Sequence, residues 1–165
     1  ALEAGFANGA LKPYFPTKDT LLEFAFGHVF NRTNSRIAGV TEGKSGIQAL
    51  RAFCLEVLPL DEERINEARI VIPFWQKAVN DPQKAEIHRR SMDEWVTTIR
   101  RFLAEARDNG DVRAAVDDSI LAGQLLNMLL GAQIDAALAP AGRTESGHTD
   151  QLDGYLALLC QEAQQ

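Results

Sequence analysis

Cysteine is scarce in this chain of 165 residues, which contains two, Cys54 and Cys160. Two cysteines are too few for a disulfide scaffold, so we expect both thiols to be reduced. Cys54 suits a small core position, and a redox-sensing thiol is the alternative. The sequence also lacks an apolar run of roughly 20 residues and a signal-peptide pattern. These absences exclude the disulfide-rich secreted class and predict a cytoplasmic protein that does not contact a membrane.

Residue patterns typical of metal sites and covalent catalysis are also missing. The histidines, His28, His88 and His148, are far apart, and no HExxH, CxxC or GxSxG motif occurs. We therefore predict no metal, no cofactor and no enzymatic activity. For His88 we expect a partly exposed position on a helix, with a place in the lining of a cavity as the alternative.

Sustained alternation of apolar and polar residues, the pattern of half-buried strands, is absent as well. Apolar residues instead recur at helical spacing. The periodic segments follow candidate capping residues, namely Thr17, Ser45, Asp61, Asp81 and either Asp117 or Asp118. The three glycines of residues 38–46 predict a loop, and Gly110 is the expected end of a helix. Pro73 falls inside one of these segments, where we expect a kink. The sequence therefore predicts an all-α fold, with helices over residues 17–36, 45–58, 61–80, 81–110, 117–140 and 149–163.

Positive charge is in short supply. The net charge of −6 argues against a protein that binds nucleic acid over its whole surface. The charges are unevenly distributed, however. The first 40 residues hold four basic and three acidic side chains, whereas the remainder holds 13 basic and 20 acidic ones. A weakly basic end on an acidic body fits a protein that presents one end to DNA.

Residues 1–37 have the pattern of a partial helix-turn-helix head followed by a connecting helix. Gly5 suits the left-handed turn between two helices, and Asn8 can cap a short second helix. The runs EAGFANGAL (3–11) and YFPTKDTLL (14–22) resemble the N-terminal signature of TetR-type transcriptional regulators. That resemblance implies a DNA-binding head whose first helix and most of whose second lie upstream, so we expect an N-terminally truncated sequence.

The resemblance implies DNA contacts for five residues of this head, Asn8, Ala10, Lys12, Tyr14 and Lys18. Asn8 can pair with adenine, Lys12 with guanine or phosphate, Ala10 with a thymine methyl group and Tyr14 with phosphate. Lys18 lies in the first turn of the next helix, where a bound phosphate would offset its repulsion from the helix dipole. The alternatives are a plain helix cap for Asn8 and solvated surface charges for the two lysines.

Residues 38–165 are predicted to form a helical ligand-binding and dimerisation domain. The segment LPLDEER (58–64), the Phe74–Trp75 pair and Gly131 resemble the ligand-binding half of the BetI-like branch. Its aromatic, thioether and amide side chains are candidates for a ligand pocket, with ordinary core packing as the alternative. Aromatic rings can also hold a quaternary ammonium ligand by cation–π attraction. The candidate pocket residues are Phe53, Phe74, Trp75, Met92, Trp95, Gln124, Asn127 and Met128.

The last two predicted helices are apolar on more than one face. A second apolar face indicates either a partner subunit or a central helix buried within one monomer. The resemblance favours a homodimer, because this family pairs its last two helices across a two-fold axis. The expected interface residues are Leu126, Leu130, Ile134, Leu152, Tyr155 and Leu159.

Together these observations predict a ligand-responsive, sequence-specific regulator, a repressor that a small-molecule effector releases from double-stranded operator DNA. The effector would favour a conformation in which the helix over 17–36 swings and changes the spacing of the two recognition helices. The alternatives are a helical module that binds a small molecule or a protein without binding DNA, and an all-α enzyme.

Two substitutions separate phosphate contact from base reading. We expect Lys18→Ala to weaken DNA binding about equally across sequences, because a phosphate contact carries no sequence information, and Asn8→Ala to relax the preference at one base position. Gel-shift titration of the full-length protein against its own upstream region and single-base variants measures both effects. Equal losses at every sequence for both variants would refute this division of roles.

Overall fold

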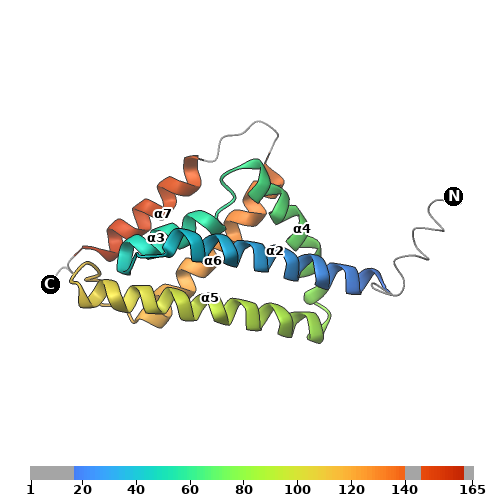
Figure 1. The fold of residues 1–165 in the computed structure, drawn as a ribbon, viewed down its shortest axis with the longest axis horizontal. Coiled ribbons are helices and arrows are strands. Elements are labelled where there is room, and N and C mark those ends of the chain that lie inside the picture. The colour runs from blue at the N-terminus through green and yellow to red at the C-terminus, as the bar shows by residue number, and fades with distance from the viewer. Residues whose placement is uncertain (1–16, 140–145, 162–165) are drawn as a thin grey trace, which may run out of the picture.

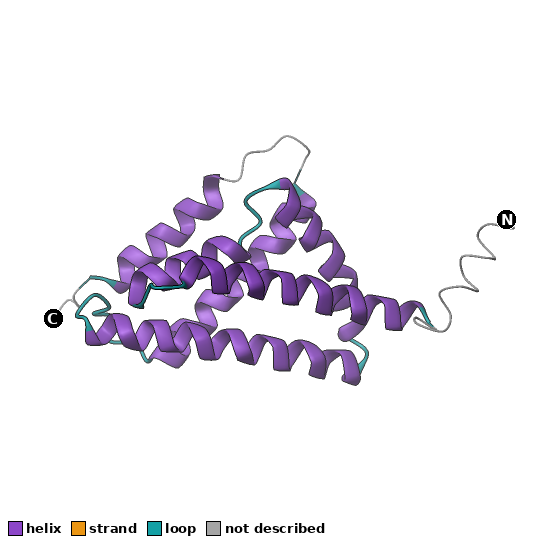
Figure 2. Cartoon of the chain, in the orientation of Figure 1, coloured by secondary structure: helices purple, strands orange, loops and turns teal. Residues whose placement is uncertain are grey.

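Six helices and no strands make up the part of the chain that the computed structural model describes, residues 17–139 and 146–161 (Figures 1 and 2). The predicted all-α fold is therefore confirmed. The helices are α2 (Lys18–Thr41), α3 (Gly46–Val57), α4 (Glu62–Ala78), α5 (Pro82–Asp108), α6 (Asp118–Leu138) and α7 (Ser146–Leu159).

Helix α2 is longer than the sequence pattern indicated. Thr17 caps its start as predicted, since the Thr17 hydroxyl oxygen accepts a hydrogen bond from the Thr20 amide at 3.1 Å. The helix does not end near residue 36, because Ile37 is buried and the Thr41 hydroxyl donates to the Ile37 carbonyl at 2.7 Å. The predicted boundary between residues 37 and 38 therefore falls inside a continuous helix.

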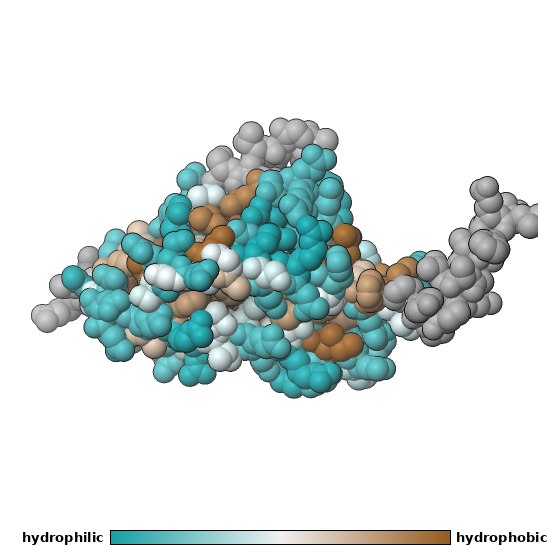
Figure 3. All heavy atoms as spheres, viewed as in Figure 1, coloured by the Kyte–Doolittle hydropathy of each residue, from teal (hydrophilic) through white to brown (hydrophobic). Residues whose placement is uncertain are grey.

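The helices pack as a bundle in which α3 and α4 hold the longer helices together. Helix α3 contacts α2, α5 and α7, and α4 contacts α2, α5 and α6. Helices α2 and α5 run along the long axis of the molecule, and α6 crosses behind them (Figure 1). The outer surface in this view is mostly hydrophilic, with apolar residues in small separate patches (Figure 3).

Two apolar clusters form the core. The larger joins α3, α5, α6 and α7 and includes Leu50, Phe53, Ile99 and Leu125, all at most 1% exposed. The smaller joins α2 to α4 through Phe26, Val29, Val71 and Phe74. Cys54 belongs to the larger cluster and is fully buried, and this burial raises the pKa of its thiol. The predicted core role of Cys54 is therefore the one its environment supports.

Helix α6 meets the length and hydropathy criteria for crossing a membrane, although its sequence contains no unbroken apolar run. Its best 18-residue window has a mean hydropathy of 1.2, and 44% of that window is buried inside the protein. The buried side includes Leu121, Leu125 and Leu129, which belong to the larger core cluster. Packing in the bundle therefore accounts for the apolar residues on the buried side of α6.

The turn into α3 depends on Gly46. This residue has a φ of +58°, and a Cβ placed on it would lie 3.3 Å from Asn109 Nδ2 and 3.4 Å from the backbone of Ala106. Ser45, predicted to cap α3, makes no side-chain capping bond. Instead Glu105 Oε1 accepts a hydrogen bond from the Gly46 amide at 3.0 Å, which ties the start of α3 to the end of α5.

Two glycine substitutions are expected to change stability in opposite directions. Gly46→Ala should lower the free energy of unfolding by roughly 1–2 kcal/mol, because L-residues resist a left-handed conformation and the site is tight. Gly39→Ala, the control inside α2 where a Cβ meets nothing within 4 Å, should raise it by about 0.5–1 kcal/mol. Urea unfolding of both variants measures the two changes, and a stabilising Gly46→Ala would contradict the account of this turn.

Candidate ligand-binding site

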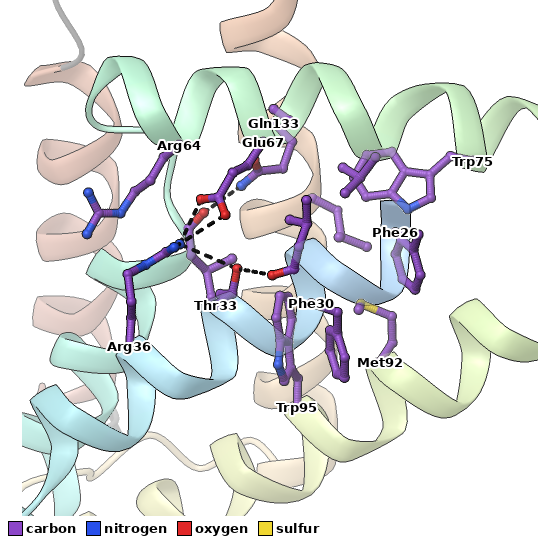
Figure 4. Close-up of a pocket in the computed structure, with 15 residues that line it drawn as sticks. Phe26, Phe30, Thr33, Arg36, Arg64, Glu67, Trp75, Met92, Trp95 and Gln133 are labelled. Carbon is purple, nitrogen blue, oxygen red and sulfur yellow. Dashed lines mark hydrogen bonds and ion pairs between the residues drawn. The ribbon is translucent and has the colours of Figure 1, made fainter. Parts of the chain in front are cut away.

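A cavity lies between α2, α4, α5 and α6, with Val57 of α3 at its edge (Figure 4). Helix α2 contributes Phe26, Val29, Phe30, Thr33 and Arg36 to its lining. The other helices contribute Arg64, Glu67, Ala68, Val71, Trp75, Met92, Trp95, Leu130 and Gln133. Its wall is therefore mostly aromatic and aliphatic, with polar groups gathered at the Arg36 end, the composition typical of small-molecule sites.

The cavity is small in this conformation. The cavity volume, counted as the space that the centres of water molecules can occupy, is about 50 Å³. Since one water needs roughly 10–15 Å³ by this measure, the space holds only a few waters. A ligand with an aromatic ring therefore fits only if the lining helices move outward.

The apolar end is built from stacked rings. Phe26 stacks on Phe74 with ring centroids 4.3 Å apart, and Phe30 lies 5.3 Å from the ring of Trp95. The indole nitrogen of Trp95 donates to Asn34 Oδ1 at 2.7 Å. The indole nitrogen of Trp75 is buried and has no hydrogen-bond partner in the described structure. Trp75 therefore presents a polar group that the protein does not satisfy.

At the polar end, Arg36 joins α2 to α3 and α4. Its two Nη atoms donate to the two carboxylate oxygens of Glu67 at 2.8 and 3.3 Å, and its Nε donates to Glu56 Oε2 at 3.2 Å. Partial burial acts to lower the pKa of Arg36, but the hydrogen bonds and charges of Glu67 and Glu56 outweigh it and raise this pKa above its ordinary value. Arg64, on the same wall, donates to Glu56 at 2.6 Å and also pairs with Asp61.

Gln133 is the buried amide of α6, at 8% exposure. Its Nε2 donates to the carbonyls of Val57 at 2.8 Å and Leu129 at 3.3 Å. Gln124 and Asn127, the two amides that the sequence predicted for the pocket, lie on the exposed face of α6. The sequence does indicate that Gln133 is buried. It follows Leu125 and Leu129 at intervals of four residues, so the three side chains share one face of the helix.

The predicted pocket residues divide into three groups. Trp75, Met92 and Trp95 line the cavity. Phe53 and Phe74 are fully packed into the core clusters, and Met128 packs against the larger one, so none of these three lines this cavity. Gln124 and Asn127 are exposed, and Gln124 Oε1 accepts a hydrogen bond from the Tyr155 hydroxyl at 2.9 Å. The sequence pattern also missed every α2 residue of the lining.

Most of the predicted interface residues lie inside the protomer. Leu126, Leu152 and Leu159 are at most 9% exposed, and Leu130 lines the cavity. Leu126, Leu152 and Leu159 pack in the core between α6 and its neighbours, so little of their surface is exposed for contact with a partner. Ile134 is 46% exposed. Tyr155 is half-buried, and its hydroxyl contacts Leu121 and Gln124 of α6.

Four of the five predicted DNA contacts, Asn8, Ala10, Lys12 and Tyr14, lie outside the described residues. Lys18 is the first residue of α2 and is exposed, as a phosphate contact requires. It lines a surface hollow together with Lys77 from the last turn of α4. The sequence pattern did not indicate that these two cations share a surface.

A sequence model of the BetI-type transcriptional repressor C-terminal domain matches residues 46–161, most of the bundle just described. The chain belongs to this family. It is also similar to the HTH-type transcriptional regulator PksA of Bacillus subtilis, with 28% identity over 141 residues that cover 85% of this chain and 67% of PksA. The predicted resemblance to TetR-type regulators of the BetI-like branch is therefore confirmed.

Solved structures agree with this assignment. A transcriptional regulator from Rhodococcus sp. Rha1 superimposes with a TM-score of 0.78 and 27% identity over 92% of this chain and 77% of its own. A TetR-family regulator from Rhodococcus sp. shares the fold, with a TM-score of 0.74 and 17% identity over 93% of this chain and 80% of its own. The relatives are transcriptional regulators rather than enzymes, and the predicted class of function, a ligand-responsive DNA-binding regulator, is confirmed.

His88, on α5, lies beside the ring of Trp75 outside the cavity wall. The two rings meet edge to face with centroids 5.9 Å apart, and the buried His88 Nδ1 has no hydrogen-bond partner in the described structure. Burial lowers the pKa of His88 below its ordinary value of 6.5. His88 is half-buried on α5, so the predicted partly exposed position on a helix is confirmed.

This lowered pKa predicts that stability falls as the pH decreases below about 6.5, the unfolded-state pKa of histidine. In that range the unfolded chain binds a proton at His88 while the folded chain does not, so acid favours unfolding. His88→Phe should flatten this part of the pH–stability curve. Urea unfolding between pH 7.5 and pH 5 measures it, with His28→Phe, a change at an exposed histidine, as the matched control. An unchanged slope in His88→Phe would contradict the assignment.

Proposed function

We propose that this regulator is a cytoplasmic, homodimeric repressor that leaves its operator when a small molecule enters the cavity between α2, α4, α5 and α6. One observation carries the proposal: α2 supplies five residues of the cavity wall and begins directly after the segment 1–17 that resembles the DNA-binding head. Any ligand that displaces α2 therefore acts on the connection to the head.

Two polar contacts fix α2 on either side of the cavity. Near its start, Lys84 of α5 is 3% exposed and donates to Glu23 at 3.2 Å and to Asp81 at 3.0 Å, with Asp19 3.9 Å away. The hydrogen bond to Asp81 is the largest cause of a raised Lys84 pKa, which burial opposes and Glu23 and Asp19 reinforce. Further along α2, Arg36 holds the helix to α3 and α4.

Because the cavity is small, a ligand that binds in it displaces the surrounding helices. A ligand larger than a few waters needs the wall to expand, and α2 is the part of the wall that leads to the head. Binding then favours the expanded conformation over the closed one, which is a population shift. In a dimer this changes the spacing of two recognition helices that must lie about 34 Å apart to reach successive major grooves.

The exposed faces of α6 and α7 support a homodimer. The two helices run antiparallel, with His148 Nε2 3.5 Å from Asp135 at one end and Tyr155 bonded to Gln124 at the other. Each exposes a stripe without a charged residue, although 24% of the chain is charged. Interface cores are depleted in charge in the same way. The stripe consists of Ile120, Gln124, Asn127, Gly131, Ile134 and Leu138 on α6 and Gly147, Gln151, Gly154 and Leu158 on α7.

Charges placed on this stripe should separate the subunits. We expect the double variant Ile134→Glu/Leu158→Glu to sediment as a monomer and to lose operator affinity, because buried like charges oppose association. Val79→Glu is the control, since Val79 is 81% exposed but lies beyond the end of α4. Analytical ultracentrifugation of the full-length protein decides, and a dimeric double variant would exclude this interface.

The repressor mechanism is tested by filling the cavity. Ala68, 1% exposed, lines the wall. We expect Ala68→Leu to retain operator binding but to lose release by effector, because its side chain occupies the space that the ligand needs. A reporter fused to the upstream region of the gene, screened against a metabolite library, measures release, with Ala104→Leu on the exposed face of α5 as control. Normal release in Ala68→Leu would refute this cavity as the effector site.

A further inference from the structure

The structure points to the chemical class of the effector, and this inference rests on the proposed function of the cavity. We propose that the cavity selects an uncharged ligand with an aromatic ring that carries one hydrogen-bond acceptor and one donor. The acceptor meets the indole nitrogen of Trp75, and the donor meets the amide oxygen of Gln133.

The charged groups of the wall already satisfy one another. Both carboxylate oxygens of Glu67 accept hydrogen bonds from Arg36, and the third side of the Arg36 guanidinium is held by Glu56. Arg64 donates from Nε to the Glu56 carbonyl, from Nη2 to the Glu56 carboxylate, and from Nη1 to Asp61. Figure 4 shows the guanidinium of Arg36 joined by dashed lines to the carboxylate of Glu67 and to the Thr33 hydroxyl. No lining charge is left to bind a ligand of opposite charge.

A charged ligand would therefore have to break this ion pair. A carboxylate that takes Arg36 leaves Glu67 without its partner, and a cation that takes Glu67 removes the bidentate partner of Arg36. Glu67 is 9% exposed, so water does not replace the lost partner. An unpaired charge in such a place is strongly unfavourable. The quaternary ammonium ligand that the sequence left open is disfavoured for the same reason.

Two polar atoms of the lining residues have no hydrogen-bond partner among the described residues. The Trp75 indole nitrogen is a buried donor without a partner in the described structure. The Gln133 amide has its orientation fixed, because Nε2 faces two backbone carbonyls that can only accept. Its Oε1 forms no hydrogen bond among the described residues and is free to accept one. A neutral ligand that supplies both missing partners gains the hydrogen bonds without disturbing an ion pair.

The aromatic ring of the proposed ligand is inferred from the apolar side chains of the cavity wall. Phe26, Phe30, Trp75 and Trp95 present aromatic surface, and Met92 adds a thioether. Aromatic pairs and sulfur–aromatic contacts favour a flat ring over an aliphatic chain in such surroundings.

The proposed preference for an uncharged ligand can be tested with three probes of nearly equal shape. Benzamide is neutral, benzoate carries a charge of −1 and benzamidine carries a charge of +1. The chain has two tryptophans, and both line the cavity, so intrinsic fluorescence of the full-length protein reports its occupancy. We expect benzamide to bind at least about tenfold more tightly than either ion at pH 8. Equal or tighter binding of benzoate or benzamidine, or no binding of benzamide, would overturn the inference.

Substitutions in the Arg36–Glu67 ion pair should allow the cavity to bind a charged ligand. Glu67→Gln leaves Arg36 in need of an anion and should gain benzoate binding, whereas Arg36→Gln leaves Glu67 unpaired and should gain benzamidine binding. The matched controls are Glu63→Gln and Arg32→Gln, since those two residues pair with each other at the exposed surface. A gain of binding cannot result from misfolding, and absence of both gains would contradict the role of the pair.

The open donor is tested separately. Trp75→Phe keeps a ring but removes the indole nitrogen, and it should weaken benzamide about tenfold while leaving toluene binding nearly unchanged; Trp95 remains as the fluorescent reporter. Equal weakening of both probes would show that the indole nitrogen has no role. Operator binding is a separate readout. Tight benzamide binding without any effect on DNA release would refute the proposed repressor mechanism and leave the ligand class intact.

Discussion

The structure depends on how Arg36 is held. This residue lies in the second half of α2, and its guanidinium joins that helix to α3 through Glu56 and to α4 through Glu67. The same group closes the polar end of the cavity. Because one side chain both fixes the connecting helix and forms part of the cavity wall, the proposed ligand-binding mechanism links occupancy of the cavity to the position of the helix. This physical link is more direct than a chain of small packing adjustments between distant sites.

A second contact limits which movements are open to α2. Lys84 secures the first turns of the helix from α5, and the Gly46–Glu105 bond secures the turn that follows its end. Between these points, Phe26, Val29, Phe30 and Thr33 face the cavity. A helix held near both ends moves as a whole by tilting or sliding rather than by bending at one residue, which is the type of rigid-body change seen in allosteric proteins.

The sequence was sufficient for the fold because the helix signals were local. Asp61 and Asp81 cap α4 and α5 as predicted, Asp117 rather than Asp118 caps α6, and Gly110 ends α5 with a φ of +80°. The errors have tertiary causes. Packing of Ile37 extends α2 through a stretch whose glycines suggested a loop. Likewise, Glu105, a residue 59 positions away, replaces the predicted Ser45 cap. The site was harder to predict, because Thr33 and Arg36 of α2 meet Glu67 of α4 only after the two helices have packed.

Under the proposed repressor mechanism, the small volume of the cavity affects how sensitive the regulator is to its effector. Since a ring-sized molecule enters only those conformers in which the wall has opened, its apparent affinity equals its intrinsic affinity scaled by the population of the open form. Residues far from the wall, such as those packing α3 on α5, then set the concentration threshold of the response by changing that population. The dose at which the gene switches is thus adjustable without altering a single contact to the ligand.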